Sequence, residues 1–383
     1  MPESLHPGVY VQQQPTGATP IEGASTSTTA FVGATALGPA GTPTFITSWF
    51  QFKDSFGGPC EGCALPLAVF QYFQNGGTRA YIVRVVNEER TPPDDVAALK
   101  MLDRLEDVSL LCIPGADAAT AAAGIHYVAQ RPLGDLFYIV DSPKPTTSAA
   151  SDAIIEVKSF LAALADTSSS AGLYFPWVEV PDPCSTVSGA TCLAPPSGMV
   201  AGLFARTDSS RGVWKAPAGS EASLLGCVGL ACEISDAEQE ELNPLGINCI
   251  RQFAASGIVV WGARTLATMS NPEFRYVPVR RFANFLKVSL FCGTQWVVFE
   301  PNDEPLWSAI RFQLNAFMTS LFRAGALEGE KPEDAFFVRC DRDNNVQATI
   351  DQGQVHILVA FAPLKPSEFV VLHIQQQRSA PLA

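Results

Sequence analysis

Residues 108–141, VSLLCIPGADAATAAAGIHYVAQRPLGDLFYIVD, decide the fold class of this chain. Apolar runs at Val108–Ile113 and Leu136–Val140 predict two strands, and the stretch between them, Ala118–Gln130, predicts a helix. A helix at Ala150–Ala165 and a strand at Leu173–Val180 continue the alternation. Strands that alternate with helices indicate a parallel or mixed sheet with helices on its faces.

The N-terminal side of this region changes character at the break Thr91-Pro92-Pro93. Before the break, the sequence predicts a helix near Pro66–Gln74 and short strands at Ala30–Gly33, Phe45–Ser48 and Arg79–Val86. The first ~25 residues contain prolines at positions 2, 7, 15 and 20 and one strand-like piece, Val9-Tyr10-Val11-Gln12. Because this segment is too short and polar for a core of its own, we expect an extended arm.

The C-terminal side begins with a helix near Met199–Ala205 and an acidic helix start at Ser235–Glu241, where Ser235 and Glu238 fit a capping box. Strands are predicted near Ile250–Phe253 and Ile258–Trp261, followed by a boundary at Asn271-Pro272 and two helices. Alternating apolar residues at Val355–Phe361 and the β-rich run Phe369–Ile374 predict the last strands.

The second helix, Leu306–Arg323, is the clearest in the chain because its apolar residues share one face. That face carries Leu306, Trp307, Ile310, Leu314, Phe317, Met318 and Leu321. The opposite face carries Ser308, Arg311, Phe312, Asn315, Thr319 and Arg323, so we expect Phe312 to be exposed.

The composition indicates that the protein oligomerises. Of 383 residues, 47% are apolar and 16% are charged, so part of the apolar excess is expected to be buried between subunits. No apolar run reaches the about 18 residues of a membrane span, and a net charge of −13 argues against nucleic-acid binding.

The first residues do not have the pattern of a signal peptide, so we expect synthesis in the cytosol and ten reduced cysteines. Cys112, Cys249, Cys292 and Cys340 lie among apolar residues and are expected to be buried.

A catalytic function is disfavoured by the sequence motifs. Asp141 at a strand end and Ser197 at a helix start have the placement of a subtilisin-like pair, but no histidine lies between them to act as base. We therefore interpret Asp141 as a turn or cap residue and Ser197 as a helix N-cap. Cys60-x-x-Cys63 lacks a second ligand pair for zinc, although Cys184 and Cys192 are distant candidates. We predict no catalytic residue, metal site or cofactor.

Several segments in order along the chain resemble contractile tail sheath proteins. They are Pro7-Gly8-Val9-Tyr10-Val11, Ser25–Gly33, Ala80–Val85, Ala205-Arg206-Thr207-Asp208, Arg211–Ala218, Leu242–Asn248, Val260–Leu266, Arg275–Arg281, Phe299–Glu304, Gly325-Ala326-Leu327 and Pro366-Ser367-Glu368-Phe369. Within about 91 to 190 the similarity lies only in the βαβ pattern.

The resemblance implies a fold and a function. The fold would combine α/β and α+β parts, with a subtilisin-like, non-catalytic domain at its centre. The predicted segments are an arm at 1–28, a β-rich domain at 29–90, the subtilisin-like sheath domain at 91–270, a C-terminal domain at 271–365 and a C-terminal strand or arm at 366–383. Copies would stack as rings around an inner tube and contract, assembled in the bacterial cytoplasm with baseplate and tail-terminator proteins, without nucleic acid or membrane insertion. A capsid or surface-layer protein, and a subtilisin-like hydrolase, remain alternatives.

Two sets of residues are predicted to carry assembly. Strand pairing between subunits would join the arm to C-terminal strands through Val9, Tyr10, Val11, Val355, Ile357, Val359, Phe369 and Val371. The resemblance implies that a C-terminal helix faces the tube, through Arg311, Phe312, Asn315, Thr319 and Arg323. The preceding helix, with Arg280, Arg281 and Lys287, is the second candidate for this contact.

Overall fold

The computed structural model describes residues 20–60, 62–85, 97–164, 168–267 and 270–368, and the chain divides into two compact units. Unit 1 takes residues 1–24 and 286–362, and unit 2 takes residues 25–285 and 363–383. Helix α8, Val277–Gly293, contributes residues to both. Among the described residues, no helix combines the length and the apolar character needed to cross a bilayer.

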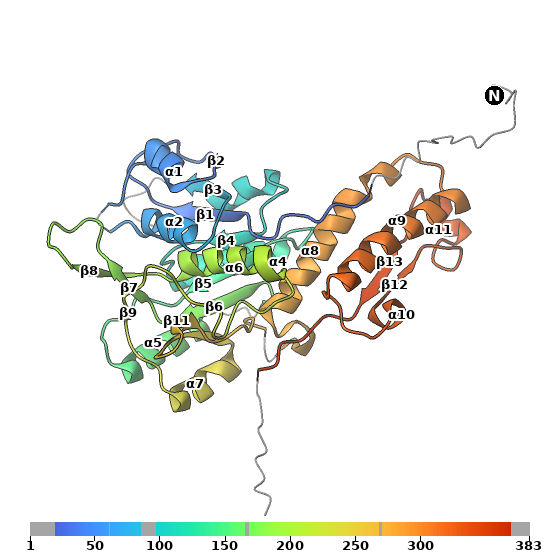
Figure 1. The fold of residues 1–383 in the computed structure, drawn as a ribbon. Coiled ribbons are helices and arrows are strands. Elements are labelled where there is room, and N and C mark those ends of the chain that lie inside the picture. The colour runs from blue at the N-terminus through green and yellow to red at the C-terminus, as the bar shows by residue number, and fades with distance from the viewer. Residues whose placement is uncertain (1–19, 61, 86–96, 165–167, 268–269, 369–383) are drawn as a thin grey trace, which may run out of the picture. The chain divides into compact units, whose positions relative to one another are not determined.

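Unit 2 is built on an eight-stranded sheet with the strand order β11-β10-β6-β5-β4-β1-β3-β2 (Figure 1). The strands from β10 to β3 in this order run parallel, while β11 and β2 run antiparallel at the two edges. The strands are β1 (Thr29–Gly33), β2 (Thr44–Ile46), β3 (Ala80–Arg84), β4 (Leu110–Cys112), β5 (Phe137–Asp141), β6 (Ala171–Phe175), β10 (Ile247–Phe253) and β11 (Gly257–Val260). The predicted parallel or mixed sheet is confirmed.

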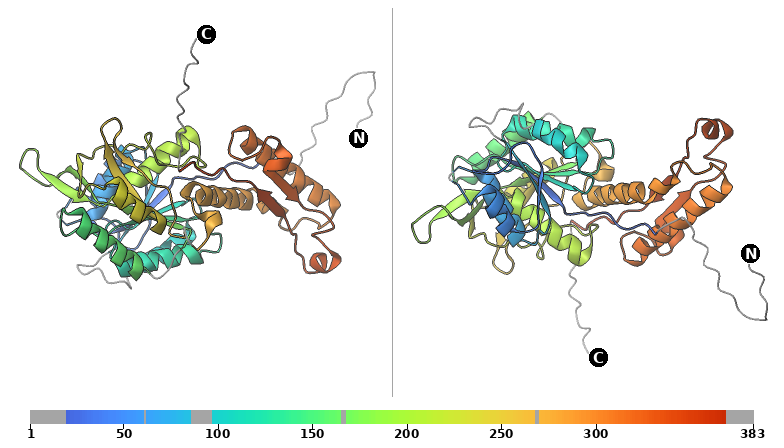
Figure 2. Two further views of the ribbon diagram at one scale, coloured as in Figure 1. Left: turned by 90° about the horizontal axis from the view of Figure 1, so that it is seen from below. Right: turned by 90° about the horizontal axis from the view of Figure 1, so that it is seen from above.

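Helices cover both faces of this sheet, as Figure 2 shows from two sides. Successive residues of β1 alternate between two cores: Val32 packs on the side of α4 and α5, and Phe31 packs on the side of α1, α2 and α6. Burial on both faces explains why the strands are apolar throughout. The helices are α1 (Trp49–Phe56), α2 (Ala64–Gln74), α4 (Ala118–Gln130), α5 (Ala150–Ala163), α6 (Ser197–Arg211) and α7 (Asp236–Leu242), and short 3-10 turns lie at Met101–Arg104, Asn243–Leu245 and Pro272–Phe274.

Helices α2 and α6 approach each other closely because α6 has glycines at the contact. A Cβ built on Gly198 would lie 2.2 Å from the carbonyl oxygen of Ala68, and one on Gly202 would lie 2.5 Å from that of Tyr72. Backbone atoms cannot move aside as a flexible side chain can, so this contact requires glycine. The close contact fixes the position of α6, which carries several of the residues discussed below.

The structure differs from the prediction at one strand and adds one helix. The predicted strand Leu173–Val180 is divided into β6 and β7 (Val178–Pro181), because Pro176 has no N–H for a ladder hydrogen bond. Strand β7 instead pairs with β8 (Thr191–Ala194) and β9 (Gly229–Leu230) in a small separate sheet. Helix α1 was not predicted, although Ser48 caps it by accepting a hydrogen bond from the Gln51 N–H. The predicted capping box at Ser235 and Glu238 is confirmed.

The segments 29–90 and 91–270 were predicted as separate domains, and the structure does not separate them. Strand β1 pairs with β3 on one side and with β4 on the other, so both segments share one sheet. The apparent boundary at Thr91-Pro92-Pro93 lies outside the described residues. A loop break in the sequence therefore does not mark a domain boundary when the strands on either side of it pair.

Unit 1 contains a long helix, α9, packed on a two-stranded antiparallel sheet. All seven residues predicted for the apolar face of α9 are buried, and Phe312 on the opposite face is 78% exposed, so both predictions are confirmed. The unit comprises η4 (Gln295–Val297), α9 (Glu304–Arg323), α10 (Pro332–Ala335), β12 (Phe336–Arg339), α11 (Gln347–Asp351) and β13 (Leu358–Phe361), together with the last residues of α8.

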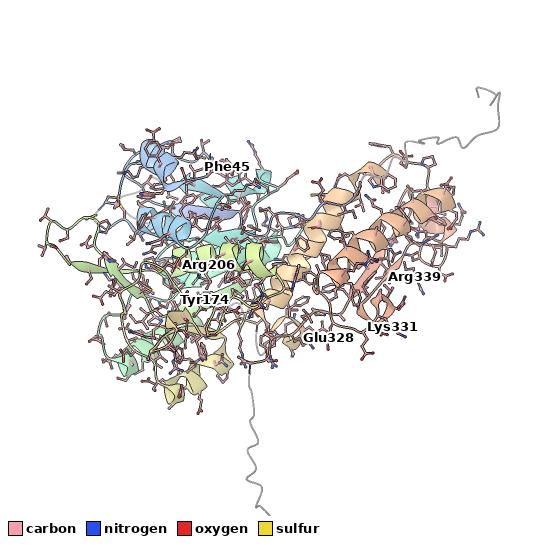
Figure 3. All side chains as sticks on the ribbon, viewed as in Figure 1. Phe45, Tyr174, Arg206, Glu328, Lys331 and Arg339 are labelled. Atoms are coloured by element: carbon pink, nitrogen blue, oxygen red, sulfur yellow. A yellow bond between two sulfur atoms is a disulfide. The ribbon has the colours of Figure 1, made fainter. Side chains whose placement is uncertain are left out.

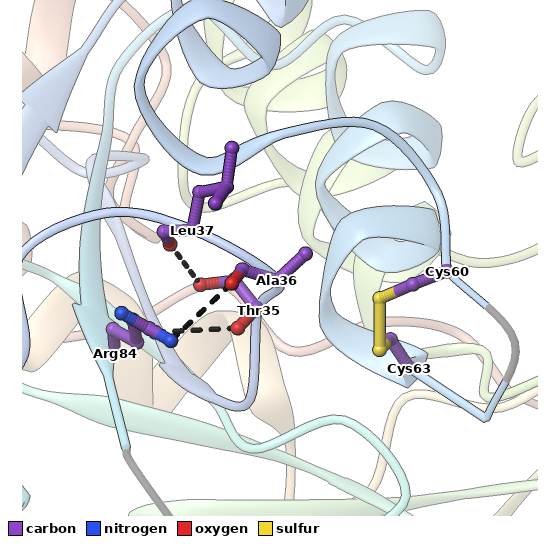
Figure 4. Close-up of a disulfide and its surroundings, with 6 residues drawn as sticks. All are labelled: Thr35, Ala36, Leu37, Cys60, Cys63 and Arg84. Carbon is purple, nitrogen blue, oxygen red and sulfur yellow. Dashed lines mark hydrogen bonds between the residues drawn. A yellow bond between two sulfur atoms is a disulfide. The ribbon is translucent and has the colours of Figure 1, made fainter.

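The expectation of ten reduced cysteines is wrong for one pair. Cys60 and Cys63 form a disulfide just before α2, and Figure 4 shows it beside the loop where Arg84 donates hydrogen bonds to the carbonyl oxygens of Thr35 and Ala36. The two cysteines are three positions apart in the chain, so their sulfur atoms meet without the closure of a long loop. Of the cysteines predicted to be buried, Cys292 is exposed. The Cys60–Cys63 bond also removes both thiolates from any zinc site.

Thiol titration in denaturant tests the disulfide. Without reductant, we expect eight thiols to react, the ten of the sequence less the bonded pair, and ten after reduction. The control Cys60→Ser leaves Cys63 unpaired, so it should titrate nine thiols with or without reductant. Ten reactive thiols in the untreated wild-type protein would contradict the pairing.

Candidate assembly surfaces

The described end of the N-terminal segment, residues 21–24, packs against the rest of unit 1. Ile21 packs in the cluster around Leu290 and Trp296, and a Cβ on Gly293 would lie 2.6 Å from the Ile21 side chain. The Ala24 N–H donates to the Ser289 hydroxyl at 2.9 Å. The predicted pairing residues Val9, Tyr10 and Val11 lie outside the described residues. Residues 21–24 therefore attach the predicted arm to unit 1.

Strands β12 and β13 form the sheet to which the arm was predicted to add. Phe336 pairs with Phe361 and Val338 with Val359, and in the described chain each strand has only the other as a neighbour. One edge of each strand is thus available for a further strand. Main-chain groups on such an edge can accept an extended segment of another subunit.

The predicted strand Val355–Phe361 is longer than the observed β13, which begins at Leu358. The side chains of Asn344 and Asn345 explain the difference, since Asn345 accepts from the His356 N–H at 2.6 Å and both asparagines donate to the His356 carbonyl. The backbone of His356 is therefore not free for a ladder. Of the predicted pairing residues, Val359 lies in β13, Val355 and Ile357 precede it, and Phe369 and Val371 lie outside the described residues.

Helix α9 presents the predicted tube-facing residues, which differ in their availability. Arg311 forms an ion pair with Glu304 at 2.6 Å and donates to the Cys340 carbonyl, so its charge is used within unit 1. Asn315 is exposed and donates to the Arg311 carbonyl at 2.8 Å. Thr319 is half-buried, and Phe312 and Arg323 are exposed. Phe312 and Arg323 are thus the residues of this set best placed to contact a partner.

The second candidate for the tube contact contains an arginine that is not available. The Arg281 guanidinium, on α8, forms a bidentate ion pair with Asp208 of α6. The side chains of Arg281 and Asp208 are 3% and 5% exposed. Thr26 completes the cluster, because its hydroxyl donates to Asp208 at 2.7 Å and its carbonyl accepts from Arg281 at 2.9 Å. Arg281 was predicted as a surface residue for the tube contact, whereas it is buried and paired with Asp208, a pair that was not predicted. An arginine between Val279 and Phe282, both buried, is the signal that could have identified the pair.

A second ion pair fixes the segment that leads to the C-terminus. The Glu368 carboxylate accepts hydrogen bonds from Nε and Nη2 of Arg264, at 2.8 and 2.6 Å. It also accepts from the Asn243 side-chain amide at 2.8 Å and from the Tyr276 hydroxyl at 3.2 Å. Burial opposes ionisation of Glu368, but the hydrogen bonds from these partners outweigh it and hold its pKa below the usual value. Residues 363–368 are thereby attached to unit 2 up to the last described residue.

Asp141 and Ser197 meet in the structure, as their placement in the sequence suggested. The Asp141 carboxylate accepts from the Ser197 N–H and from its hydroxyl, both at 2.7 Å, and from the Gly115 N–H at 3.0 Å. The interpretation of Ser197 as the N-cap is wrong, because Pro196 occupies that position and Ser197 is the first residue of α6. The Asp141 carboxylate instead accepts from the first N–H of the helix, as its interpretation as a cap residue suggested. The Ser197 side chain is completely buried, which leaves no surface for a substrate.

Comparisons with known proteins agree with this architecture. Residues 88–266 match the family model described as the phage tail sheath protein central domain, and residues 269–377 match the phage tail sheath C-terminal domain. The chain is 31% identical over 180 residues to the tail sheath protein of Vibrio phage KVP40, which is 47% of this chain and 26% of that protein. It is 33% identical over 166 residues to that of Burkholderia phage BcepMu, 42% of this chain and 34% of that protein.

Solved structures match over almost the whole chain. The helical sheath of the anti-feeding prophage in the contracted state has a TM-score of 0.80 and 30% identity, covering 98% of this chain and 100% of that one. The sheath complex of the extracellular contractile injection system PVC, also contracted, has a TM-score of 0.77 and 29% identity, covering 98% and 99%. The fold is thus that of a contractile sheath subunit, and the chain belongs to the phage tail sheath family. Its match to the KVP40 protein spans about a quarter of that protein's length.

Proposed function

We propose that copies of this chain polymerise as stacked rings around an inner tube and contract to drive the tube through a target envelope. The likeness over nearly the full length to a helical sheath in the contracted state is the observation that carries the proposal. The two compact units favour it, because contraction of a lattice requires subunits that move as bodies while their contacts change.

Arm exchange would hold the lattice together during this change. Residues of the arm around Val9, Tyr10 and Val11, and of the C-terminal run around Phe369 and Val371, would pair with the open edges of β12 and β13 in neighbouring copies. The attachment of residues 21–24 to unit 1 and of residues 363–368 to unit 2 gives each arm a fixed starting point. The main-chain hydrogen bonds between an arm and the strand of a neighbouring copy would then persist while the arm bends between this strand and its own point of attachment.

The partners of the particle would be an inner tube protein, a baseplate and a tail terminator, assembled in the bacterial cytoplasm without nucleic acid or membrane insertion. The baseplate is supported by a likeness to the anti-feeding prophage baseplate structure, with a TM-score of 0.79 and 30% identity. Residues 91–270 would keep a subtilisin-like arrangement without proteolysis. The buried Ser197, hydrogen-bonded directly to Asp141 with no histidine between them in the chain, supports a structural role for this pair.

Electron microscopy of the purified, self-assembled chain tests the proposal against other polymers. A sheath subunit should form hollow, striated cylinders. Closed shells would instead indicate a capsid protein, and flat lattices would indicate a surface-layer protein.

The tube contact is tested by reversing one charge on α9. Arg323→Glu is expected to reduce the fraction of tube-filled sheaths while leaving the monomer folded, because Arg323 is exposed on the face we assign to the tube. Each exposed ion pair is worth only about 0–1 kcal/mol, but the term recurs in every subunit. Arg311 is unsuitable for this test because its reversal would also break the contact with Glu304.

Arg342→Glu is the matched control, since it makes the same charge change at an exposed arginine outside α9. Micrographs of co-expressed sheath and tube give the fraction of filled sheaths. Equal fractions for the two variants would exclude the α9 face as the tube contact.

A further inference from the structure

One aromatic side chain of unit 1 is presented to solvent on a strained backbone. Phe299 is fully exposed, and its φ of 73° is the positive value that bulky residues rarely adopt. Glu300 beside it is exposed and makes no ion pair with any other residue that the structure describes. We call these two residues the Phe299 knob. Strained residues held in place by their surroundings often serve a contact.

The surroundings of the knob hold it on both sides. Before it, the Trp296 indole donates to Gln313 at 2.8 Å. After it, Asn302 accepts from the Trp307 indole at 2.8 Å and donates to the Gln354 carbonyl at 2.8 Å. These hydrogen bonds hold the residues on either side of Phe299, whose side chain is exposed. Aromatic side chains, phenylalanine among them, are enriched at the centres of protein interfaces.

Unit 2 contains a pocket whose chemistry complements the knob. It has a volume of about 390 Å³ and lies between the C-terminal half of α6 and residues 215–222. Its apolar part is formed by Ala216, Pro217 and Ala218, and its cations are Arg206, Arg211 and Lys215. A cavity of about 150 Å³ already holds a benzene ring, so this pocket has room for a phenylalanine side chain.

Two of the three cations lack a carboxylate partner in the described chain. Arg211 pairs with Glu221 at 2.9 Å, but Arg206, labelled in Figure 3, donates only to the carbonyl oxygens of Asn75 and Ser223. Burial without a counterion lowers the pKa of Arg206. Lys215 is half-buried and forms no ion pair with a described residue. The pocket therefore offers an apolar surface beside unpaired positive charge.

We infer that the Phe299 knob of one copy inserts into this pocket of a second copy, with Phe299 against Pro217 and Ala218 and Glu300 paired with Lys215. An aromatic ring also lies favourably over an arginine such as Arg206. The knob and the pocket are formed by different residues of the chain, so the contact joins unlike parts of two copies and is heterologous. Such contacts close into rings or propagate into open helical polymers, depending on the rotation between successive copies. This inference rests on the proposed sheath function and specifies one of its subunit contacts.

Photo-crosslinking in assembled sheaths tests the contact. The photoreactive residue p-benzoylphenylalanine replaces Phe299, and sheaths are assembled around the tube protein from equal parts of ¹⁵N-labelled and unlabelled protein. We expect crosslinks between residue 299 of one copy and residues 206–222 of a differently labelled copy. The control places the same group at Phe312, which should crosslink to the tube protein and not to residues 206–222.

Charge reversal provides a second, independent readout. Lys215→Glu and Glu300→Lys should each lower the crosslinking yield and the assembly rate by about fivefold, the effect of one exposed ion pair per contact, and the double variant should restore both. Phe299→Gly removes the backbone strain of the positive φ, because glycine adopts such values readily. The monomer of this variant should therefore resist urea at least as well as the wild type, while its assembly is weakened.

The outcomes distinguish this contact from the proposed function. Tubular sheaths in which residue 299 crosslinks to the tube protein, to its own chain or to another segment of a neighbour would overturn the knob-and-pocket contact and leave the sheath function standing. A wild-type chain that forms no tubular polymer would overturn both.

Discussion

Deletion of residues 2–19 is expected to yield a folded monomer that no longer forms sheaths. The deleted segment carries Val9, Tyr10 and Val11, the strand-like residues proposed to pair with β12 and β13 of another copy. The structure determines where the cut is made. A deletion that extended to residue 24 would also remove Ile21 and Ala24, whose contacts with Gly293 and Ser289 belong to the fold of unit 1.

Sedimentation and circular dichroism separate assembly from folding in this variant. The control keeps the length of the arm but replaces Val9, Tyr10 and Val11 with glycine, which weakens strand formation without shortening the chain. We expect the control to assemble poorly as well, because the loss lies in strand pairing and not in reach. Long sheaths from the deleted protein would refute arm exchange.

The largest expected effect on stability follows removal of Asp208. Asp208→Ala leaves the Arg281 guanidinium buried without its carboxylate, and breaking a buried pair in this way costs about 3–5 kcal/mol. That is a large part of the about 5–15 kcal/mol by which domains are stable. Thr26 also loses the acceptor of its hydroxyl, so the strand that follows it is less well fixed to α6.

Glu221→Ala is the matched control for Asp208→Ala. It also removes a carboxylate from an arginine, but Arg211 and Glu221 are 54% and 66% exposed, so the cost should stay within about 0–1 kcal/mol. Urea unfolding of the assembly-deficient 2–19 deletion, followed by tryptophan fluorescence, compares the two without interference from polymers. Equal losses for both variants would mean that the buried pair contributes no more than a surface pair.

Much of the fold could be predicted because local sequence pattern and burial agree. The alternation at 108–180 predicts the inner strands, and the apolar spacing of Leu306–Arg323 predicts the buried face of α9. Prediction failed where distant residues decide the outcome. His356 leaves the strand because Asn344 and Asn345 bind its backbone, and 29–90 joins 91–270 because β1 lies between β3 and β4.

The candidate site was less predictable for a related reason. The spacing along α9 gives the direction of Arg311 but not its partners, Glu304 and Cys340, of which Cys340 is 29 positions away. The pair of Arg281 and Asp208 joins residues 73 positions apart, and the apolar neighbours of Arg281 indicate its burial but not its partner. Periodicity shows which face of a helix is polar, whereas the availability of a charge depends on the tertiary fold.

Cryo-electron microscopy of assembled particles, before and after contraction is induced, tests whether this chain forms a contractile sheath. We expect one helical polymer of the chain in two states, with a shorter axial rise per ring in the second state and each compact unit unchanged in internal fold. A polymer with the same rise in both states, or a shortening produced by refolding within the units, would contradict it.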